Sequence, residues 1–215
     1  AKWCGGTVEP EFEQVRVKGF TKDSRQLAPG NMYVAIQGAR VDGHDFVKQV
    51  LENGAAAVLV EKRQGPGVPA VLVKDTEAAL GSIASGYRAT MHAKVLAITG
   101  SVGKTTTKEM LAAIMSKSHV TGKTPQNYNN RLGLPLSLLN MAPDCEVAVL
   151  EMGMNHFGEM SYLTHIARPD IAVISNIGTM HIENLGSRQG ILQAKLEILE
   201  GLQPGGSIVF NGDEP

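Results

Sequence analysis

The sequence predicts an α/β protein of two domains, because strands and helices alternate regularly in its second half and shorter runs of both kinds fill its first half. A chain of 215 residues is long enough for two modest domains with buried cores. Strands that alternate with helices form a mostly parallel sheet with helices on both faces. We place the boundary before a new strand–helix unit, so that the first domain spans 1–93 and the second 94–215.

The first domain has the pattern of a small α/β unit between Val15 and about Lys74. Its β-like runs are NMYVAIQG, AAAVLVEK and PAVLVKD, and one helical stretch, HDFVKQVLENG, lies among them. The opening AKWCGG is typical of a last helical turn closed by Gly5 and Gly6. A longer helix over TEAALGSIASGYRATMH follows, since its apolar residues recur at helical spacing.

In the second domain we expect strands over 95–99, 146–151, 171–176 and 207–211, and helices over 104–117, 157–167 and 187–202. The run VLAIT is continuously apolar, as a parallel strand covered on both faces should be. The segment TTTKEMLAAIM that follows it is a good helix former. The chain stops at FNGDEP, a turn just after a strand, so we expect this sheet to be incomplete.

The composition is that of an ordinary globular protein, with 43% hydrophobic and 19% charged residues. A formal net charge of −1 gives no reason to expect binding to nucleic acid or to an acidic membrane. No apolar run approaches the roughly 20 residues that span a bilayer, and no secretion signal is recognisable. Cys4 and Cys145 match no metal or redox spacing, so we expect reduced thiols in a cytoplasmic protein.

The stretch TGSVGKTT joins the first strand of the second domain to its first helix. The common phosphate-binding loop has a glycine, four residues of any kind, and then Gly-Lys-Ser/Thr. Gly103, Lys104 and Thr105 supply the end of this pattern, but Ile98 occupies the opening position and the first glycine is Gly100. Strand, glycine turn and helix are nevertheless the context that such a loop requires. We interpret it as a tighter variant whose backbone N–H groups bind nucleotide phosphates.

The nucleotide-binding residues that we expect are Gly100, Ser101, Val102, Gly103, Lys104, Thr105 and Thr106. Lys104 can reach the β- and γ-phosphates, and the Thr105 hydroxyl can hold Mg²⁺. Glu151, at the carboxyl end of the run CEVAVLEMG, would supply a metal-side carboxylate. His181 follows the next strand, at the edge where open α/β sheets bind ligands, although a surface loop histidine is the alternative. An Asn-Lys-x-Asp signature is absent from the sequence, which argues against a GTPase switch.

Lys195 interrupts an apolar helical stripe. Ile191, Lys195, Ile198 and Leu202 fall at i, i+4, i+7 and i+11, which is one face of a helix. A lysine in such a stripe can extend its ammonium to water. Alternatively, it is desolvated, so that the neutral amine is favoured. A neutral amine can react with CO₂ to form a carbamate, which is an anionic metal ligand, and the stripe alone leaves both possibilities open.

Five segments in order, TGSVGKTTTKEM, NYNNRLGLPLSLL, LEMGMNHFGEM, NIGTMHIENLGS and AKLEIL, together resemble the Mur ligases. These are ATP-dependent amide-forming enzymes of peptidoglycan synthesis. The earlier segment TKDSRQLAPGNMYVAIQGARVDGHDF resembles their UDP-sugar-binding domain, so the resemblance spans nearly the whole chain. The double asparagine before Gly-x-Pro and the run Glu-x-Gly-x-Asn-His-x-Gly-Glu favour members that add D-alanyl-D-alanine to UDP-N-acetylmuramoyl-tripeptide.

The resemblance implies a small N-terminal α/β UDP-sugar-binding domain, then a P-loop ATPase-like central domain, and a C-terminal domain for the amino substrate that this chain lacks. It implies ATP and Mg²⁺, and a reaction through an acyl phosphate. The catalytic residues that it implies are Lys104, Glu151, His181 and Lys195. Thr105 and Glu151 would hold one Mg²⁺, while His181 and carbamylated Lys195 would place a second.

The resemblance also implies substrate contacts, at Ser24, Arg25, Arg40, Asp42, His44, Asn127 and Asn130. For Arg25 and His44 a structural hydrogen-bonding role is equally compatible with the sequence. Two alternative functions stay open: a sibling ligase that adds another amino acid, and a non-catalytic nucleotide- or UDP-sugar-binding module. We expect a monomer that binds no nucleic acid and does not insert into membranes.

Overall fold

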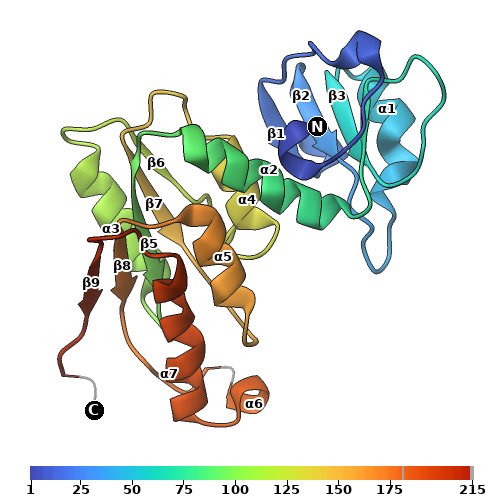
Figure 1. Ribbon diagram of the computed structural model, residues 1–215. Helices are drawn as coiled ribbons and strands as arrows, with labels where there is room; N and C mark the ends of the chain where they lie inside the picture. The colour runs from blue at the N-terminus through green and yellow to red at the C-terminus, as the bar shows by residue number, and fades with distance from the viewer. Residues whose placement is uncertain (181, 214–215) are drawn as a thin grey trace. The chain divides into compact units, whose positions relative to one another are not determined.

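The computed structural model describes residues 1–180 and 182–213 and confirms the α/β class (Figure 1). The chain divides into two compact units, Ala1–Ile83 and Ala84–Pro215, and each unit contains its own sheet. The division falls inside helix α2 (Thr76–Thr90), earlier than the boundary expected between 93 and 94, because one continuous helix leads from the first unit into the second. The functional roles of the two domains stay predictions.

The first unit is built on a four-stranded sheet of order β1-β2-β3-β4 in which every pair is parallel. Its strands are β1 (Gly19–Thr21), β2 (Asn31–Val34), β3 (Ala57–Val60) and β4 (Ala70–Leu72). Its helices are α1 (Val47–Glu52) and the 3-10 turns η1 (Lys2–Cys4), η2 (Pro10–Phe12), η3 (Ser24–Gln26) and η4 (Gly43–Phe46). The turn expected before Gly5 is present as η1, and Gly5 closes it with φ of 61°.

The second unit contains a five-stranded parallel sheet of order β6-β7-β5-β8-β9. Its strands are β5 (Lys94–Thr99), β6 (Thr121–Lys123), β7 (Val147–Glu151), β8 (Ile171–Ile174) and β9 (Ser207–Phe210). Its helices are α3 (Lys104–Met115), α4 (Gly133–Leu139), α5 (Glu159–Ala167), α6 (Ile182–Leu185), α7 (Arg188–Leu196) and the 3-10 turn η5 (Glu197–Gly201). The strand before the glycine loop, β5, is therefore central.

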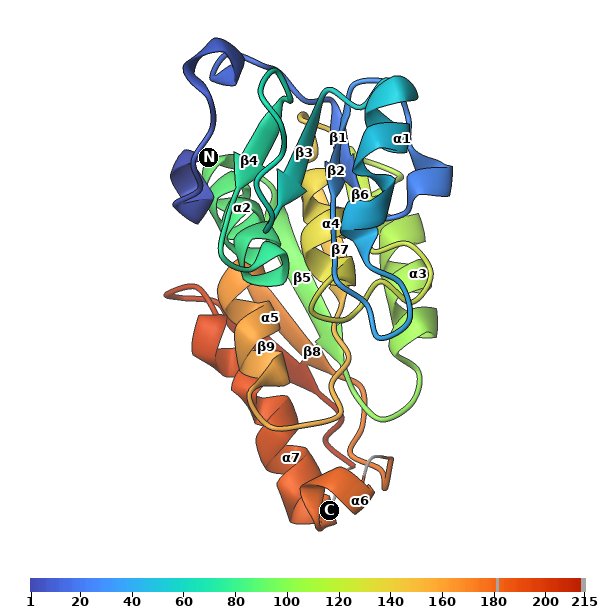
Figure 2. The same cartoon turned by 90° about the vertical axis from the view of Figure 1, so that its right-hand side faces the viewer.

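Helices cover both faces of this sheet, as expected. Leu96 and Ile98 of β5 belong to a core that includes Ala112 of α3. The alternate β5 residue Ala97, which is fully buried, points to the opposite face. Figure 2 shows α3 and α5 on opposite sides of β5. In the described part of the chain, every helix is too short or too polar to cross a lipid bilayer.

Two elements of the second unit carry no periodic signal in the sequence. Strand β6 is only TGK, and its pairing with β7 defines it. Helix α4, GLPLSLL, is buried at every position, so it lacks the alternation of polar and apolar faces that marks an amphipathic helix. The single helix expected over 187–202 is instead α7 followed by η5.

Turn η5 packs against α5 and thereby fixes the end of α7. The Thr164 hydroxyl of α5 donates to the Ile198 carbonyl at 2.7 Å. The Glu197 carboxylate accepts from the backbone N–H groups of Gly158 and Ser161, at the start of α5. A carboxylate at a helix N-terminus stabilises the helix. Gly201 lies so close that an added Cβ would be 2.3 Å from the Thr164 carbonyl oxygen.

Gly201→Ala should therefore destabilise the second unit by about 1–3 kcal/mol, because the methyl group has no space against the α5 backbone. The matched control is Gly212→Ala, where an added Cβ meets no atom within 4 Å. It should change the free energy of unfolding by less than about 0.5 kcal/mol. Urea unfolding of the two variants measures the difference, and equal stability would contradict the packing described.

Candidate nucleotide and metal site

The glycine loop lies where the sequence predicts, between β5 and α3. Gly103 precedes the first residue of α3 with φ of 82°, and no side chain caps the helix. The first N–H groups of a helix have no partner within the helix, so they are available to an anion. Gly100 has φ of 149°, and a Cβ there would lie 1.9 Å from the Ser175 Oγ. Both glycines are thus required by the backbone.

Residues that follow β8 hold the loop in place. The Asn176 Oδ1 accepts from the N–H groups of Ser101 and Val102, each at 3.0 Å. The Ser101 hydroxyl oxygen accepts from the Gly178 N–H at 2.8 Å, and the Ser175 hydroxyl donates to the Val102 carbonyl at 2.7 Å. Sequence reasoning did not identify Asn176. Its only signal is its place directly after an apolar strand, at the ligand-binding edge of the sheet.

Lys104 folds back over its own loop. Its Nζ donates to the carbonyl oxygens of Gly100 at 2.7 Å and Ser101 at 3.2 Å. Burial lowers the pKa of Lys104, while the nearby Glu151 charge opposes this shift. Thr105 and Thr106 follow in the first turn of α3 and are exposed. The ammonium and the first helical amides are therefore placed where they can share one phosphate group.

Glu151 ends β7, next to the loop, because Glu151 pairs in register with Ile98 of β5. It is 2% exposed, and donors hold both carboxylate oxygens. The Thr105 hydroxyl donates to Oε2 at 2.9 Å, and the Asn129 side-chain amide donates to Oε1 at 2.9 Å. The Glu151 N–H donates to the Thr124 hydroxyl at 3.0 Å, which fixes the backbone as well.

The Thr105 hydroxyl and the Glu151 carboxylate fit a magnesium ion. Mg²⁺ prefers oxygen ligands and usually takes one or two from the protein, with waters and substrate phosphates for the rest. Across residues 1–180 and 182–213, no three His, Cys, Asp or Glu side chains form a candidate metal cluster. His181, expected as a further metal ligand, lies outside the described residues.

Lys195 of α7 is buried, at 3% exposure, so its ammonium does not extend into bulk water as the alternative required. It lines a pocket of about 220 Å³. The residues that line this pocket are Gly100, Lys104, Asn129, Asn130, Arg131, Gly153, Met154, Asn155, Glu159, Leu163 and Lys195. Burial, and secondarily the Lys104 charge, lowers the pKa of Lys195 to about 8. Two lysines thus face one small pocket, which favours an anion there.

The loop after β6 contributes asparagines to the lining of this pocket, but of the expected pair, Asn127 and Asn130, only Asn130 lines it. The Asn130 Oδ1 accepts from the N–H groups of Leu132 and Gly133, so Asn130 fixes the turn before α4 as well as lining the pocket. Asn127 is not one of the lining residues. Asn129, which sequence reasoning missed, contacts Glu151 directly. The adjacent asparagines gave no indication of which side chain faces inward.

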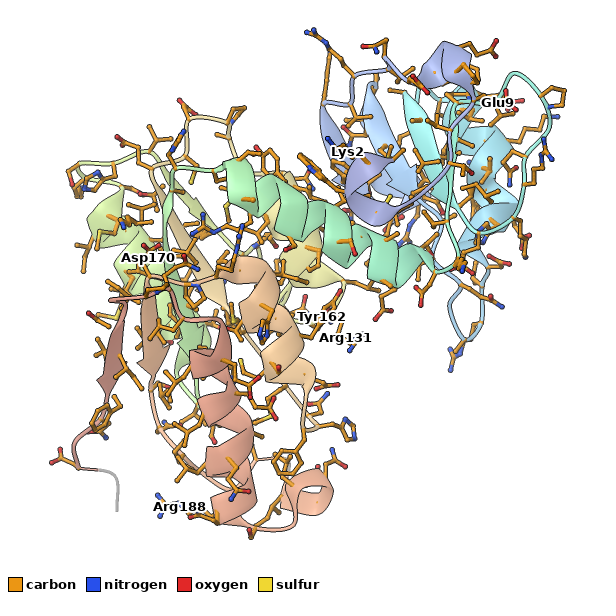
Figure 3. All side chains as sticks on the ribbon, in the orientation of Figure 1. Lys2, Glu9, Arg131, Tyr162, Asp170 and Arg188 are labelled. Atoms are coloured by element: carbon orange, nitrogen blue, oxygen red, sulfur yellow. The ribbon has the colours of Figure 1, made fainter. Side chains whose placement is uncertain are left out.

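Arg131 follows these asparagines and also lines the pocket. Its guanidinium carbon lies 4.3 Å from the centre of the Tyr162 ring of α5, and Figure 3 shows the two side chains next to one another. A guanidinium over an aromatic ring is held by cation–π attraction. Arg131 therefore adds a third positive charge at the rim, and sequence reasoning did not single it out.

In the first unit, the Ser24–Arg25 turn follows β1, and the Arg40–His44 turn follows the neighbouring parallel strand β2. The pKa of the buried Tyr33 is raised to about 12 by burial and by the charges of Asp23 and Asp42, which belong to these two turns. Both turns therefore lie near the same end of the sheet. This is one edge at which a ligand could contact the two together.

The charged groups of these turns already have partners within the chain. Arg25 pairs with Asp23 at 2.7 Å and lowers the pKa of that carboxyl to about 2. Lys62 pairs with Asp42 at 2.6 Å. The His44 Nε2 accepts from the Glu61 N–H at 2.9 Å, so its Nδ1 carries the proton and donates to Asp42 at 2.6 Å.

His44 is therefore engaged at both ring nitrogens, and its side chain is 4% exposed. These contacts favour the structural role for His44 over a direct ligand contact. Arg25, in contrast, has a side chain that is 87% exposed, and a ligand could reach it. Ser24 belongs to the same turn as Arg25, and Arg40 belongs to the same turn as His44.

Lys195→Met should stabilise the chain at neutral pH. The folded-state pKa near 8 lies below the ordinary 10.5, so the unfolded chain binds this proton more tightly. Burial of the ammonium then costs up to about 3 kcal/mol at pH 7, and the cost falls as the pH rises from 8 towards 10.5. Urea unfolding in CO₂-depleted buffer at pH 7 and pH 10 measures the difference between the variant and the wild type. A variant less stable than the wild type at pH 7 would contradict the desolvation argument.

Comparison with known proteins bears on the whole chain. The Mur ligase middle domain matches residues 98–215, and the Mur ligase family catalytic domain matches residues 16–88. The UDP-N-acetylmuramoyl-tripeptide–D-alanyl-D-alanine ligase of Bacillus subtilis (strain 168) is 44% identical over an alignment of 215 residues that covers 98% of this chain and 47% of the relative. The ligase of the same name from Escherichia coli (strain K12) is 41% identical and covers 95% of this chain and 45% of the relative.

Solved structures agree with the sequence relatives. A crystal structure of MurF from Acinetobacter baumannii has a TM-score of 0.90 and 38% identity, and covers 99% of this chain and 48% of that one. The MurF ligase of Thermotoga maritima in complex with ADP has a TM-score of 0.85 and 35% identity, and covers 94% of this chain and 48% of that one. The chain spans about half the length of the relatives that it matches. The resemblance read from the motifs is confirmed: this chain belongs to the Mur ligase family.

Proposed function

We propose that this chain provides the UDP-sugar-binding and ATP-binding domains of a ligase that joins D-alanyl-D-alanine to UDP-N-acetylmuramoyl-tripeptide. The two relatives cited above are curated as ligases of this kind. One structural observation supports the proposal most strongly. Lys104, Lys195 and the Thr105–Glu151 pair surround the end of one glycine loop.

The reaction brings two anions together, and the site carries the groups to neutralise them. A carboxylate oxygen of the tripeptide bonds to the γ-phosphorus of ATP, and the bond from that phosphorus to ADP breaks. The amine of D-alanyl-D-alanine then bonds to the acyl carbon, inorganic phosphate leaves, and the nitrogen loses a proton. Preorganised N–H groups and cations stabilise the charge that develops in such transfers.

Each residue of the loop has a separate task in this scheme. The N–H groups from Gly103 to Thr106 contact phosphate oxygens, as the N-terminus of a helix does, because those of Ser101 and Val102 already donate to Asn176. Lys104 leaves its two loop carbonyls and pairs with the β- and γ-phosphates. Asn130 and Arg131, at the pocket rim, contact the acyl substrate or the transferred phosphate. Asn127 stays a weaker candidate, since it does not line the pocket.

Thr105 and Glu151 would hold one Mg²⁺, and Lys195, as a carbamate, together with His181 would hold a second. When bound, the ions neutralise phosphate charge and orient its oxygens. Lys195 is suited to carbamylation because it is buried and faces the pocket, and in the described part of the chain its ammonium has no acidic partner. Carbamylation replaces a cation with an anionic oxygen donor, which Mg²⁺ prefers.

The first unit would bind the uridine nucleotide through its Ser24–Arg25 and Arg40–His44 turns. Arg25 and Arg40 supply cations for the diphosphate, while Asp42 and His44 hold the second turn in shape. We further propose that the protein acts as a monomer in the cytoplasm, where its UDP-linked substrate and ATP are found.

Binding and ligation test the function separately. Calorimetry of this chain should detect UDP-N-acetylmuramoyl-tripeptide, and UDP-N-acetylglucosamine, which lacks the peptide, should bind more weakly. For ligation, this chain can replace the aligned half of the Bacillus subtilis relative. The chimaera should release phosphate from ATP only when D-alanyl-D-alanine and the tripeptide precursor are both present. Turnover with a different amino acid in place of the dipeptide would favour a sibling ligase.

Lys104→Ala should weaken ADP binding by at least about tenfold, because hydrogen bonds to a charged group contribute roughly 1.5–3 kcal/mol. The matched control is Lys117→Ala, an exposed lysine just beyond α3, which should bind ADP like the wild type. Calorimetric titration with ADP and Mg²⁺ compares the three proteins. Unchanged affinity in a folded Lys104→Ala variant would remove the loop from the nucleotide site.

Lys195→Ala and Lys195→Arg should both lose nearly all ligation activity in the chimaera, since neither side chain can form the carbamate. A small carboxylate such as acetate should partly restore the alanine variant, whose site is vacant, but not the arginine variant. With ¹³C-labelled CO₂ and Mg²⁺–ADP, the wild-type chain should show a carbamate carbon signal by NMR that the arginine variant lacks. An active arginine variant would exclude the carbamate.

A further inference from the structure

Lys108 is a buried cation that neither the motif nor the proposed reaction assigns. It lies on α3, one helical turn after Lys104, and its side chain is 0% exposed. Burial of an ammonium costs several kcal/mol unless charged and polar partners surround it. Ordinary core packing does not require a lysine at this position, so its partners should reveal what it does.

Those partners come from three separate segments of the site. The Lys108 Nζ is 3.7 Å from the Glu151 Oε2 at the end of β7. It donates to the Gln126 carbonyl at 3.3 Å, in the loop that carries the asparagines. It also pairs with Glu109 at 3.2 Å, a half-exposed carboxylate that in turn contacts Lys123.

The Glu151 carboxylate is thereby surrounded by groups of the chain itself. Oε1 accepts from Asn129, while Oε2 faces both the Thr105 hydroxyl and the Lys108 ammonium. Groups that orient a metal ligand from behind typically change metal affinity by 10–100-fold. A cation close to a metal site has the opposite effect if it acts only through its charge, since it repels the incoming ion. The two effects predict changes of opposite sign.

We propose that Lys108 is a positioning residue, which fixes the Glu151 carboxylate and the asparagine loop in the geometry that binds Mg²⁺ with the nucleotide. The inference rests on the function proposed above and adds to it a residue that touches neither phosphate nor substrate. It follows that the effect of Lys108 on the orientation of Glu151 outweighs its repulsion of the metal ion. Loss of the Lys108 cation therefore weakens Mg²⁺ binding even though a positive charge is removed.

The test uses calorimetry to compare ADP binding with and without Mg²⁺ in the wild-type chain and in three variants. Lys108→Met keeps the length of the side chain without its charge. Lys108→Gln keeps a donor for the Gln126 carbonyl, also without charge. Glu109→Gln, the matched control, removes the other carboxylate partner of Lys108 and leaves its contact with Glu151. Thermal unfolding establishes that each protein is folded at the assay temperature.

Both Lys108 variants should bind ADP without Mg²⁺ within about twofold of the wild type, since Lys104 and the loop are unchanged. The gain in ADP affinity that Mg²⁺ produces should fall at least tenfold in both. Glu109→Gln should keep the full gain. If Lys108 served only the stability of the fold, its replacement would lower the unfolding temperature but would leave the gain in ADP affinity that Mg²⁺ produces unchanged.

A folded Lys108→Met or Lys108→Gln variant with a wild-type or larger Mg²⁺-dependent gain would overturn the inference and leave the proposed function intact. A loss in Lys108→Met alone would overturn it too, because the Gln126 contact would then suffice. A wild-type chain whose ADP binding does not respond to Mg²⁺ would overturn the proposed metal site itself. The failure of each proposal is thus distinguishable.

Discussion

The arrangement of the second unit depends on one buried carboxylate. Glu151 stands at the end of β7, and its oxygens bring together α3 through Thr105, the loop after β6 through Asn129, and the interior of α3 through Lys108. Its backbone N–H adds Thr124. A buried carboxylate is stable only when donors and cations compensate for the water it has lost. The same requirement that holds these segments together therefore also prepares two oxygens for a cation.

The fold and the contiguous part of the site could be predicted because their signals are local. Strands such as β5 are continuous apolar runs, and the alternation of strands with helices implies a parallel sheet with both faces covered. The glycine loop is a single stretch whose neighbours in sequence are also its neighbours in space. Lys195 was recognisable for a related reason: a charge in an apolar helical stripe is either desolvated or extended to water, and the structure shows that Lys195 is buried.

The rest of the site depends on contacts between distant segments, which a single sequence does not encode in any period. Asn129 reaches Glu151 through the register of a loop that begins at the short strand β6. Asn176 meets the glycine loop only because β8 lies beside β5. For His44 the sequence left two roles open, ligand contact and structural hydrogen bonding, and the contacts that the chain makes at both ring nitrogens favour the second.

The attachment of the glycine loop to the residues after β8 has a consequence for how fast a ligand binds. Asn176 and Ser175 hold the backbone of Ser101 and Val102, and Gly178 holds the Ser101 hydroxyl, through hydrogen bonds within the chain. The conformational entropy of ordering these residues is therefore already lost when the chain folds, and binding does not incur that cost again. If the loop binds an anion, this ordering implies an association limited by diffusion and orientation rather than by a slow closure of the loop.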